Sequence, residues 1–114
     1  MRQSTNLYKA LSDQNRLRIL LMLQEKSLCV CEIVEILELA NSTVSKHLSI
    51  LRNVDLIMDE KDGRWVNYRL ATKMESEKIE SVMLQLHELL KDDDTIQHDN
   101  QQLVGVDRFQ ICGT

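Results

Sequence analysis

The chain has 114 residues, a formal net charge of −4 and three cysteines. A chain of this length can bury one modest core, so we expect a single folded domain. It lacks both the roughly 18 to 20 consecutive apolar residues that cross a bilayer and the apolar run of a secretion signal, so we expect a cytoplasmic protein with no membrane partner.

The negative charge is concentrated at the C-terminal end. From residue 92 onward there are five acidic residues and one basic residue, so residues 1–91 carry no net charge. A neutral body can still gather its basic side chains on one face and bind phosphates. We expect a folded domain over residues 1–91 and an acidic, flexible tail over residues 92–114.

Apolar periodicity predicts three helices in the first third of the chain. The first covers about Ser4–Leu11, the second runs from the capping residues Ser12 and Asp13 through Glu25, and the third covers about Cys31–Leu37. The second has a wide apolar face, as expected of a central core helix. A turn is expected over residues 38–41, before the next helix.

A fourth helix is expected after Asn41, which can cap it. Val44, Leu48 and Leu51 stand at i, i+4 and i+7 and form a buried stripe. The other faces carry hydroxyl and basic side chains and no acid, namely Ser42, Thr43, Ser45, Lys46, His47, Ser49 and Arg52. An ordinary helical hairpin with a solvated face is one interpretation of this pattern. A helix-turn-helix that places these side chains against operator DNA is the other.

The segment that follows favours the DNA-binding interpretation. Residues 57–70 alternate in polarity around Asp62-Gly63, a dipeptide typical of tight hairpin turns. We expect a two-stranded wing in which Arg64 and Arg69 contact the DNA backbone. The predicted fold class is therefore mainly α with a β-hairpin wing, a winged helix-turn-helix.

A last helix over about residues 75–91 has its own apolar stripe. The other helices already share a core, so this helix is expected to pack against its copy in a homodimer.

Cys29 and Cys31 are separated by one residue. In an extended segment, positions i and i+2 point to the same face, so two thiolates at a strand-to-helix junction can bind one ion. Thiolates favour thiophilic ions such as arsenite, antimonite, cadmium, lead or zinc. Two small buried hydrophobic residues are the alternative. In the reducing cytosol, we expect Cys29, Cys31 and Cys112 to be ligands or buried thiols and not disulfides.

Four segments taken in order resemble the ArsR/SmtB metalloregulators, arsenical-resistance repressors in particular. They are KALSDQNRLRIL (residues 9–20), LCVCEI (28–33), STVSKHL (42–48) and GRWVNYRL (63–70). The resemblance covers about residues 5–90. It implies a homodimeric repressor that holds its operator when metal-free and leaves it when Cys29 and Cys31 bind an inducer.

Three positions depart from the family pattern. Gln14 stands where many members have proline, and Asp55 where glycine is common. Val34 stands where several arsenic sensors carry a third cysteine. Cys112 is therefore a candidate third ligand, reached through the flexible tail.

The sequence thus predicts a repressor released by arsenite or antimonite, with a cadmium, lead or zinc sensor as the alternative. A cytosolic dithiol redox protein belongs to a different class, and it would show no salt-dependent affinity for DNA. A serine hydrolase is disfavoured, because Ser45 and His47 stand two apart on one predicted helix and no acid is placed to orient the histidine.

Overall fold

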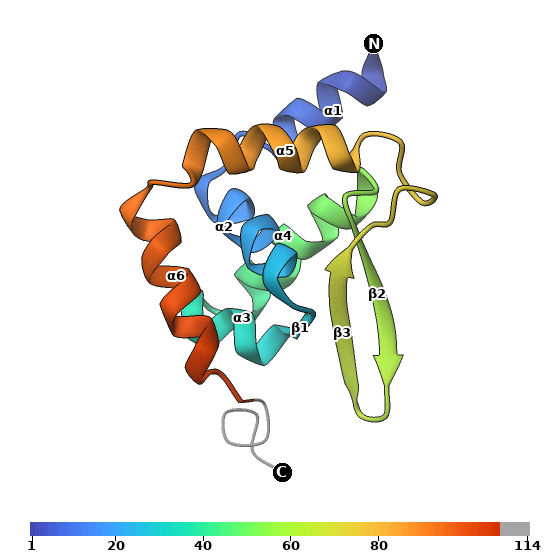
Figure 1. Cartoon of the computed structure of the whole chain (residues 1–114). Helices are drawn as coiled ribbons and strands as arrows, with labels where there is room; N and C mark the ends of the chain where they lie inside the picture. The colour runs from blue at the N-terminus through green and yellow to red at the C-terminus, as the bar shows by residue number, and fades with distance from the viewer. Residues whose placement is uncertain (108–114) are drawn as a thin grey trace.

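A computed structural model describes residues 1–107 and shows a helical body with a three-stranded sheet on one side (Figure 1). In chain order, the elements are α1 (Arg2–Ala10), α2 (Gln14–Glu25), β1 (Leu28–Cys29), α3 (Val30–Leu37), α4 (Asn41–Asn53), β2 (Ile57–Asp62), β3 (Trp65–Leu70), α5 (Ile79–Leu90) and α6 (Asp94–Gly105). No helix among these residues is long and apolar enough to span a membrane.

Helix α2 is the central core helix that the sequence predicts. The carboxylate of Asp13 caps it by accepting from the backbone N–H groups of Asn15 and Arg16, at 2.8 and 3.2 Å. All residues from Ile19 to Leu23 are buried. The helix packs against α4, α5, α6 and β3, so most of the fold is assembled around it.

The predicted helix-turn-helix is formed by α3 and α4. Helix α3 ends at Leu37 and is capped by Glu38, which adopts the left-handed backbone conformation with φ of 57°. Helix α4 begins three residues after Glu38. Asn41 was expected to cap α4, but Ala40 occupies the cap position and Asn41 is the first helical residue. Val44, Leu48 and Leu51 are fully buried, which confirms the predicted apolar stripe.

The predicted wing is the hairpin of β2 and β3. The two strands pair from Ile57 with Leu70 to Asp62 with Trp65, and Gly63 makes the turn with φ of 61°. The expected two-stranded sheet has a third strand, because β1 pairs with β3 and places Cys29 opposite Asn67. A two-residue strand lacks the alternation that would reveal it.

Residues 94–105, expected as part of an irregular tail, form helix α6 instead. Asp93 caps this helix, and Ile96 and Leu103 are buried against the body. The Asp99 carboxylate, which is 2% exposed, accepts two hydrogen bonds from the Arg18 guanidinium, both of 2.9 Å. Figure 1 shows α6 beside α2 and α3. The acidic residue counted as tail charge is thus part of the packed structure.

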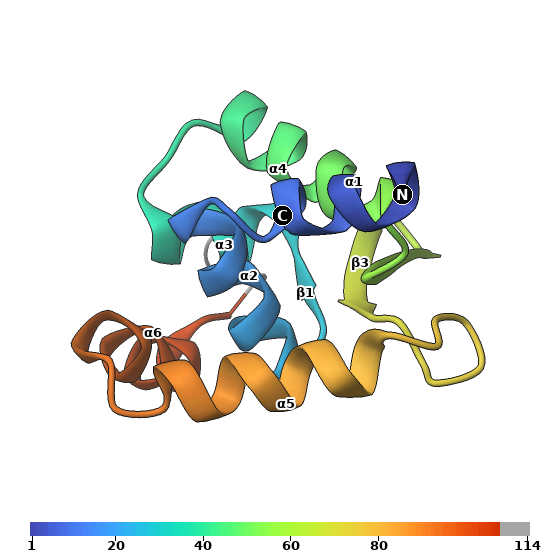
Figure 2. The ribbon, with the colours of Figure 1, turned by 90° about the horizontal axis from the view of Figure 1, so that it is seen from above.

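Helices α1 and α5 leave apolar side chains on the surface. Helix α5 begins at Ile79, four residues later than expected, and buries Val82 and Leu86 against the body. Leu84 and Leu89 of the same helix are 66% and 72% exposed. Figure 2 shows α5 along the side of the molecule opposite α4. This location leaves α4 accessible if the exposed apolar side chains of α5 are covered by a second copy.

Candidate DNA-binding surface and cysteine site

The hydroxyl and basic side chains of α4 lie on the surface of the molecule. The buried stripe of α4 turns Ser42, Thr43, Ser45, Lys46 and Ser49 to the exposed side. Three of them, together with Arg16, His47 and Ile50, line a shallow concave surface. The predicted DNA-contacting residues of α4 are thus brought together on one accessible face, free of carboxylates from α4 itself.

Arg16 was not among the predicted site residues, and it enters this surface from α2. Its Nε donates to the carbonyl of Ala10 at 2.7 Å and one terminal nitrogen donates to the carbonyl of Lys9 at 3.1 Å. The other terminal nitrogen lies 3.1 Å from Nδ1 of His47. Sequence spacing gave no indication of this contact, because 31 residues separate Arg16 from His47.

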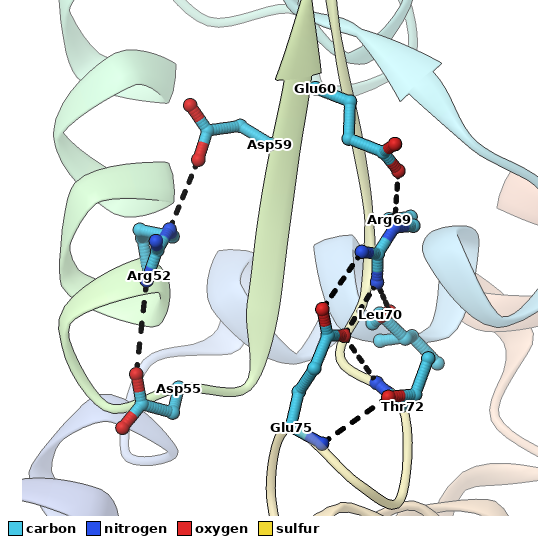
Figure 3. A network of polar contacts seen from close by, with 8 residues as sticks. All are labelled: Arg52, Asp55, Asp59, Glu60, Arg69, Leu70, Thr72 and Glu75. Atoms are coloured by element: carbon cyan, nitrogen blue, oxygen red, sulfur yellow. Dashed lines mark hydrogen bonds and ion pairs between the residues drawn. The ribbon is translucent and has the colours of Figure 1, made fainter.

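Two of the arginines predicted to contact DNA form ion pairs with carboxylates of this chain (Figure 3). Arg52 pairs with Asp59 at 3.0 Å and with Asp55 at 3.8 Å, at the junction of α4 and the wing. Arg69 pairs with Glu60 and Glu75, at the base of the wing. A phosphate contact by either arginine would have to compete with these carboxylates, so the structure favours a role in holding the wing to the body.

The Arg69 pairing changes the acid-base behaviour of this network. Hydrogen bonds from Arg69 and from the Thr72 backbone, which outweigh the effect of burial, lower the pKa of Glu75 to about 2. The hydrogen bonds that Arg69 donates to Glu75 and Glu60 raise the pKa of Arg69 above its ordinary value. Arg69 and Glu75 therefore both stay charged at neutral pH.

Arg64 lies at the tip of the wing, directly after the turn glycine. Its guanidinium stacks over the Trp65 ring, 4.5 Å from the ring centroid. The stacking holds a positive charge at the end of the hairpin. This is the location at which a wing residue can contact a phosphate on DNA bound to α4.

The cysteine pair lies at a junction of strand and helix, as predicted. Cys29 ends β1, is 2% exposed and stands at the N-cap of α3 with extended backbone angles. Its backbone N–H donates to the Glu32 carboxylate at 2.9 Å, and its sulfur accepts from the Glu32 backbone, which makes a capping box. The unpaired N–H groups at the start of a helix favour a thiolate over a thiol at this position.

Cys31 lies in the first turn of α3 and is half-buried. The expectation that the cysteines stay reduced does not hold for Cys31, which is disulfide-bonded in the structure. A metal ligand must be a thiolate, so a ligand role for Cys31 applies to the reduced chain. Cys112 lies outside the described residues.

Two elements connect the cysteine junction to the DNA-binding surface. Helix α3, which begins beside the cysteines, packs against α4. Strand β1, which carries Cys29, pairs with β3 of the wing. Within residues 1–107, no three His, Cys, Asp or Glu side chains are grouped so that they could hold a metal ion.

Comparison with known proteins places this arrangement in a family. The model of the bacterial regulatory proteins of the arsR family matches residues 13–58, which include α2, α3 and α4. A cadmium resistance transcriptional regulatory protein CadC homolog from Staphylococcus aureus is 34% identical over 84 residues, which cover 73% of this chain and 69% of that protein. The chain belongs to the ArsR family.

Another similar ArsR-family protein is the arsenical resistance operon repressor of Escherichia coli, 44% identical over 66 residues. The aligned residues cover 57% of this chain and 56% of the repressor, so the chain spans little more than half of that relative's length.

Two solved structures show the same fold. HlyU from Vibrio cholerae is 33% identical, with a TM-score of 0.69 over 80% of this chain and 95% of that chain. The homodimeric winged helix-turn-helix DNA-binding domain of Mb0332 from Mycobacterium bovis is 26% identical, with a TM-score of 0.65 over 78% of this chain and 82% of that chain. The predicted winged helix-turn-helix is thus confirmed.

Proposed function

We propose that this ArsR-family chain is a cytoplasmic transcriptional repressor that binds operator DNA as a homodimer and is released by arsenite or antimonite. The observation that carries the DNA-binding part is the exposed face of α4, where hydroxyl and basic side chains surround a shallow concavity. Ser42, Thr43 and Lys46 line it, and Ser45 and Ser49 are exposed on the same helix. These donors suit the acceptor-rich edges and phosphates of a major groove.

Dimerisation is supported by exposed apolar side chains on α5 and α1. Leu84 and Leu89 of α5 and Tyr8 of α1 are each more than 60% exposed. Covering such side chains of α5 with a second copy removes apolar surface from water and leaves both α4 helices accessible. The dimer is then expected to recognise two half-sites about one helical turn, or a multiple of it, apart.

Inducer binding is proposed at the thiolates of Cys29 and Cys31, with Cys112 as the third sulfur. Arsenite and antimonite are thiophilic, and the N-cap position of Cys29 at the start of α3 favours its thiolate. Drawing both sulfurs onto one ion would shift the start of α3, which packs against α4, and would pull on β1, which pairs with the wing. A coupling of a few kcal/mol is enough to clear an operator, since each 1.4 kcal/mol changes affinity about tenfold.

A second candidate inducer is a divalent thiophilic ion: cadmium, lead or zinc. The similarity to the CadC homolog supports this alternative. Both candidate inducers would bind the same two cysteines. They are distinguished by which ion releases DNA at the lower concentration.

Replacing Lys46 with alanine is expected to weaken DNA binding about tenfold and to reduce the salt dependence of affinity by about one counterion. The measurement is fluorescence anisotropy at several salt concentrations, with a duplex selected from a random-sequence library on the wild-type protein. Lys91→Ala is the matched control, because Lys91 directly follows α5, the helix that lies on the side of the molecule opposite α4 (Figure 2). Equal losses in the two variants, or none in either, would place the DNA elsewhere.

A further inference from the structure

The contact between Arg16 and His47 joins α2 to the exposed face of α4. We infer that Arg16 is a positioning residue for DNA recognition, which holds His47 as the tautomer that carries its proton on Nε2. This inference rests on the proposed function, because it assigns a state to a side chain of the proposed DNA-binding surface.

The Arg16 guanidinium is fixed before DNA arrives. It bonds to the carbonyls of Lys9 and Ala10, which lie in the last turn of α1. The Lys9 carbonyl also accepts from the backbone N–H and the hydroxyl of Ser12, at 3.2 and 2.7 Å. A cation at this end of a helix is also favoured by the helix dipole. With these two bonds made, the remaining terminal nitrogen of the planar guanidinium points in one direction, toward His47.

The chemistry of arginine then decides which nitrogen of His47 carries the proton. A guanidinium donates hydrogen bonds and has no acceptor. The 3.1 Å contact is therefore a hydrogen bond when Nδ1 offers its lone pair, and the ring proton sits on Nε2. If Nδ1 carried the proton, two N–H donors, one of Arg16 and one of His47, would face each other at 3.1 Å.

The resulting imidazole presents a single donor, Nε2–H. His47 is half-buried and lines the same concavity as Ser42, Thr43 and Lys46. A ring fixed in this tautomer can donate to an acceptor such as guanine N7 or O6, or thymine O4, and cannot accept from the amino group of adenine or cytosine through Nε2. Arg16 thus affects which base edge His47 can bind, although Arg16 belongs to a different helix.

The Asp13 carboxylate is close enough to Arg16 for the two charges to interact. Although burial acts in the opposite direction, hydrogen bonds from the backbone of Arg16 and Asn15 and the charge of Arg16 lower the pKa of Asp13. Asp13 therefore stays ionised at neutral pH and keeps its role as the cap of α2. The same residue that caps α2 also fixes the first turn of that helix, from which Arg16 extends.

The first test is the tautomer in the wild-type protein. Two-bond proton–nitrogen correlation spectra of the uniformly ¹⁵N-labelled full chain at neutral pH identify which ring nitrogen of His47 is protonated, with the His47→Gln spectrum as the assignment control. We expect a protonated Nε2 and an unprotonated Nδ1. A proton on Nδ1, alone or in an imidazolium, would overturn the inference whatever the DNA-binding result.

The second test is a double-mutant cycle on the selected duplex. Arg16→Lys keeps the positive charge but cannot make all three contacts, and we expect it to weaken DNA binding about tenfold in the wild-type background. In the His47→Ala background, the same change should cost less than about twofold, since the residue through which Arg16 acts is gone. Lys46→Ala is the matched control background, because Arg16 does not act through Lys46. In that background Arg16→Lys should still weaken DNA binding about tenfold.

The cycle also separates this inference from the proposed function. If the wild-type protein selects no duplex from the library, the proposed function fails and the tautomer measurement alone tests the inference. If the wild-type protein binds DNA and the Arg16→Lys cost is equal in the His47→Ala and wild-type backgrounds, the inference is wrong and the proposed function stands. Urea denaturation of each variant shows whether all of them are folded at the assay temperature.

Discussion

Replacing Cys29 or Cys31 with serine is expected to abolish arsenite-induced release of DNA and to leave DNA affinity within about twofold of wild type. A serine hydroxyl does not replace a thiolate as a ligand of arsenic. At position 29, serine keeps the helix cap, because serine followed three residues later by Glu32 is the preferred capping box. The measurement is fluorescence anisotropy of the operator complex during titration with arsenite.

Cys112→Ser tests whether a third sulfur takes part in inducer binding. We expect weaker arsenite binding with induction retained, because Cys29 and Cys31 still bind the inducer when the third ligand is lost. X-ray absorption of the bound wild-type and Cys112→Ser proteins counts the sulfur ligands of arsenic directly. Full induction in Cys29→Ser or Cys31→Ser would contradict the proposed site, and equal sulfur counts would exclude Cys112.

Replacing Asp99 with alanine is expected to lower the free energy of unfolding by about 3 to 5 kcal/mol, a large part of a small domain's total stability. The change leaves the Arg18 guanidinium, which is 19% exposed, without the carboxylate that accepts two of its hydrogen bonds. The variant also removes the hydrogen bonds to Asp99 that raise the pKa of Arg18 in the wild-type protein. Arginine keeps its proton in proteins even without such a partner, so losing the proton cannot relieve the unpaired charge. The measurement is urea denaturation of the reduced protein.

The double variant Arg18→Met with Asp99→Leu separates the unpaired charge from the loss of α6 itself. Because it removes both charges and keeps the apolar volume, it should be closer to wild type than Asp99→Ala is. A loss below about 1 kcal/mol in Asp99→Ala would show that α6 does not depend on this ion pair.

The parts of the fold that the sequence predicts correctly are those specified by neighbouring residues. The stripe of Val44, Leu48 and Leu51 sets the orientation of α4, and the exposed hydroxyl and basic side chains follow from it. The cap at Asp13 and the turn at Gly63 are equally local, because each depends on a few adjacent backbone angles.

The parts that were missed depend on partners far along the chain. Helix α6 is polar in sequence, and its stability comes from contacts such as the Asp99 to Arg18 pair, 81 residues apart. Strand β1 exists because β3 is beside it. Arg16 joins the DNA-binding surface through a contact across 31 residues, and Arg69 is drawn into ion pairs by Glu60 and Glu75. Periodicity within one element does not reveal such pairings.

The central claim is that a thiophilic inducer at the cysteine junction releases the repressor from DNA. The most direct measurement is a titration of the complex between the wild-type protein and its selected duplex with arsenite, antimonite, cadmium, lead and zinc. A phosphine reductant keeps Cys31 reduced without supplying a competing thiol. We expect release by arsenite or antimonite at concentrations below those of the three divalent ions, and loss of that release in the Cys29→Ser and Cys31→Ser proteins. The claim would be contradicted if the duplex stayed bound to the wild-type protein through all five titrations. It would also be contradicted if arsenite released the duplex equally well from the wild-type and Cys29→Ser proteins.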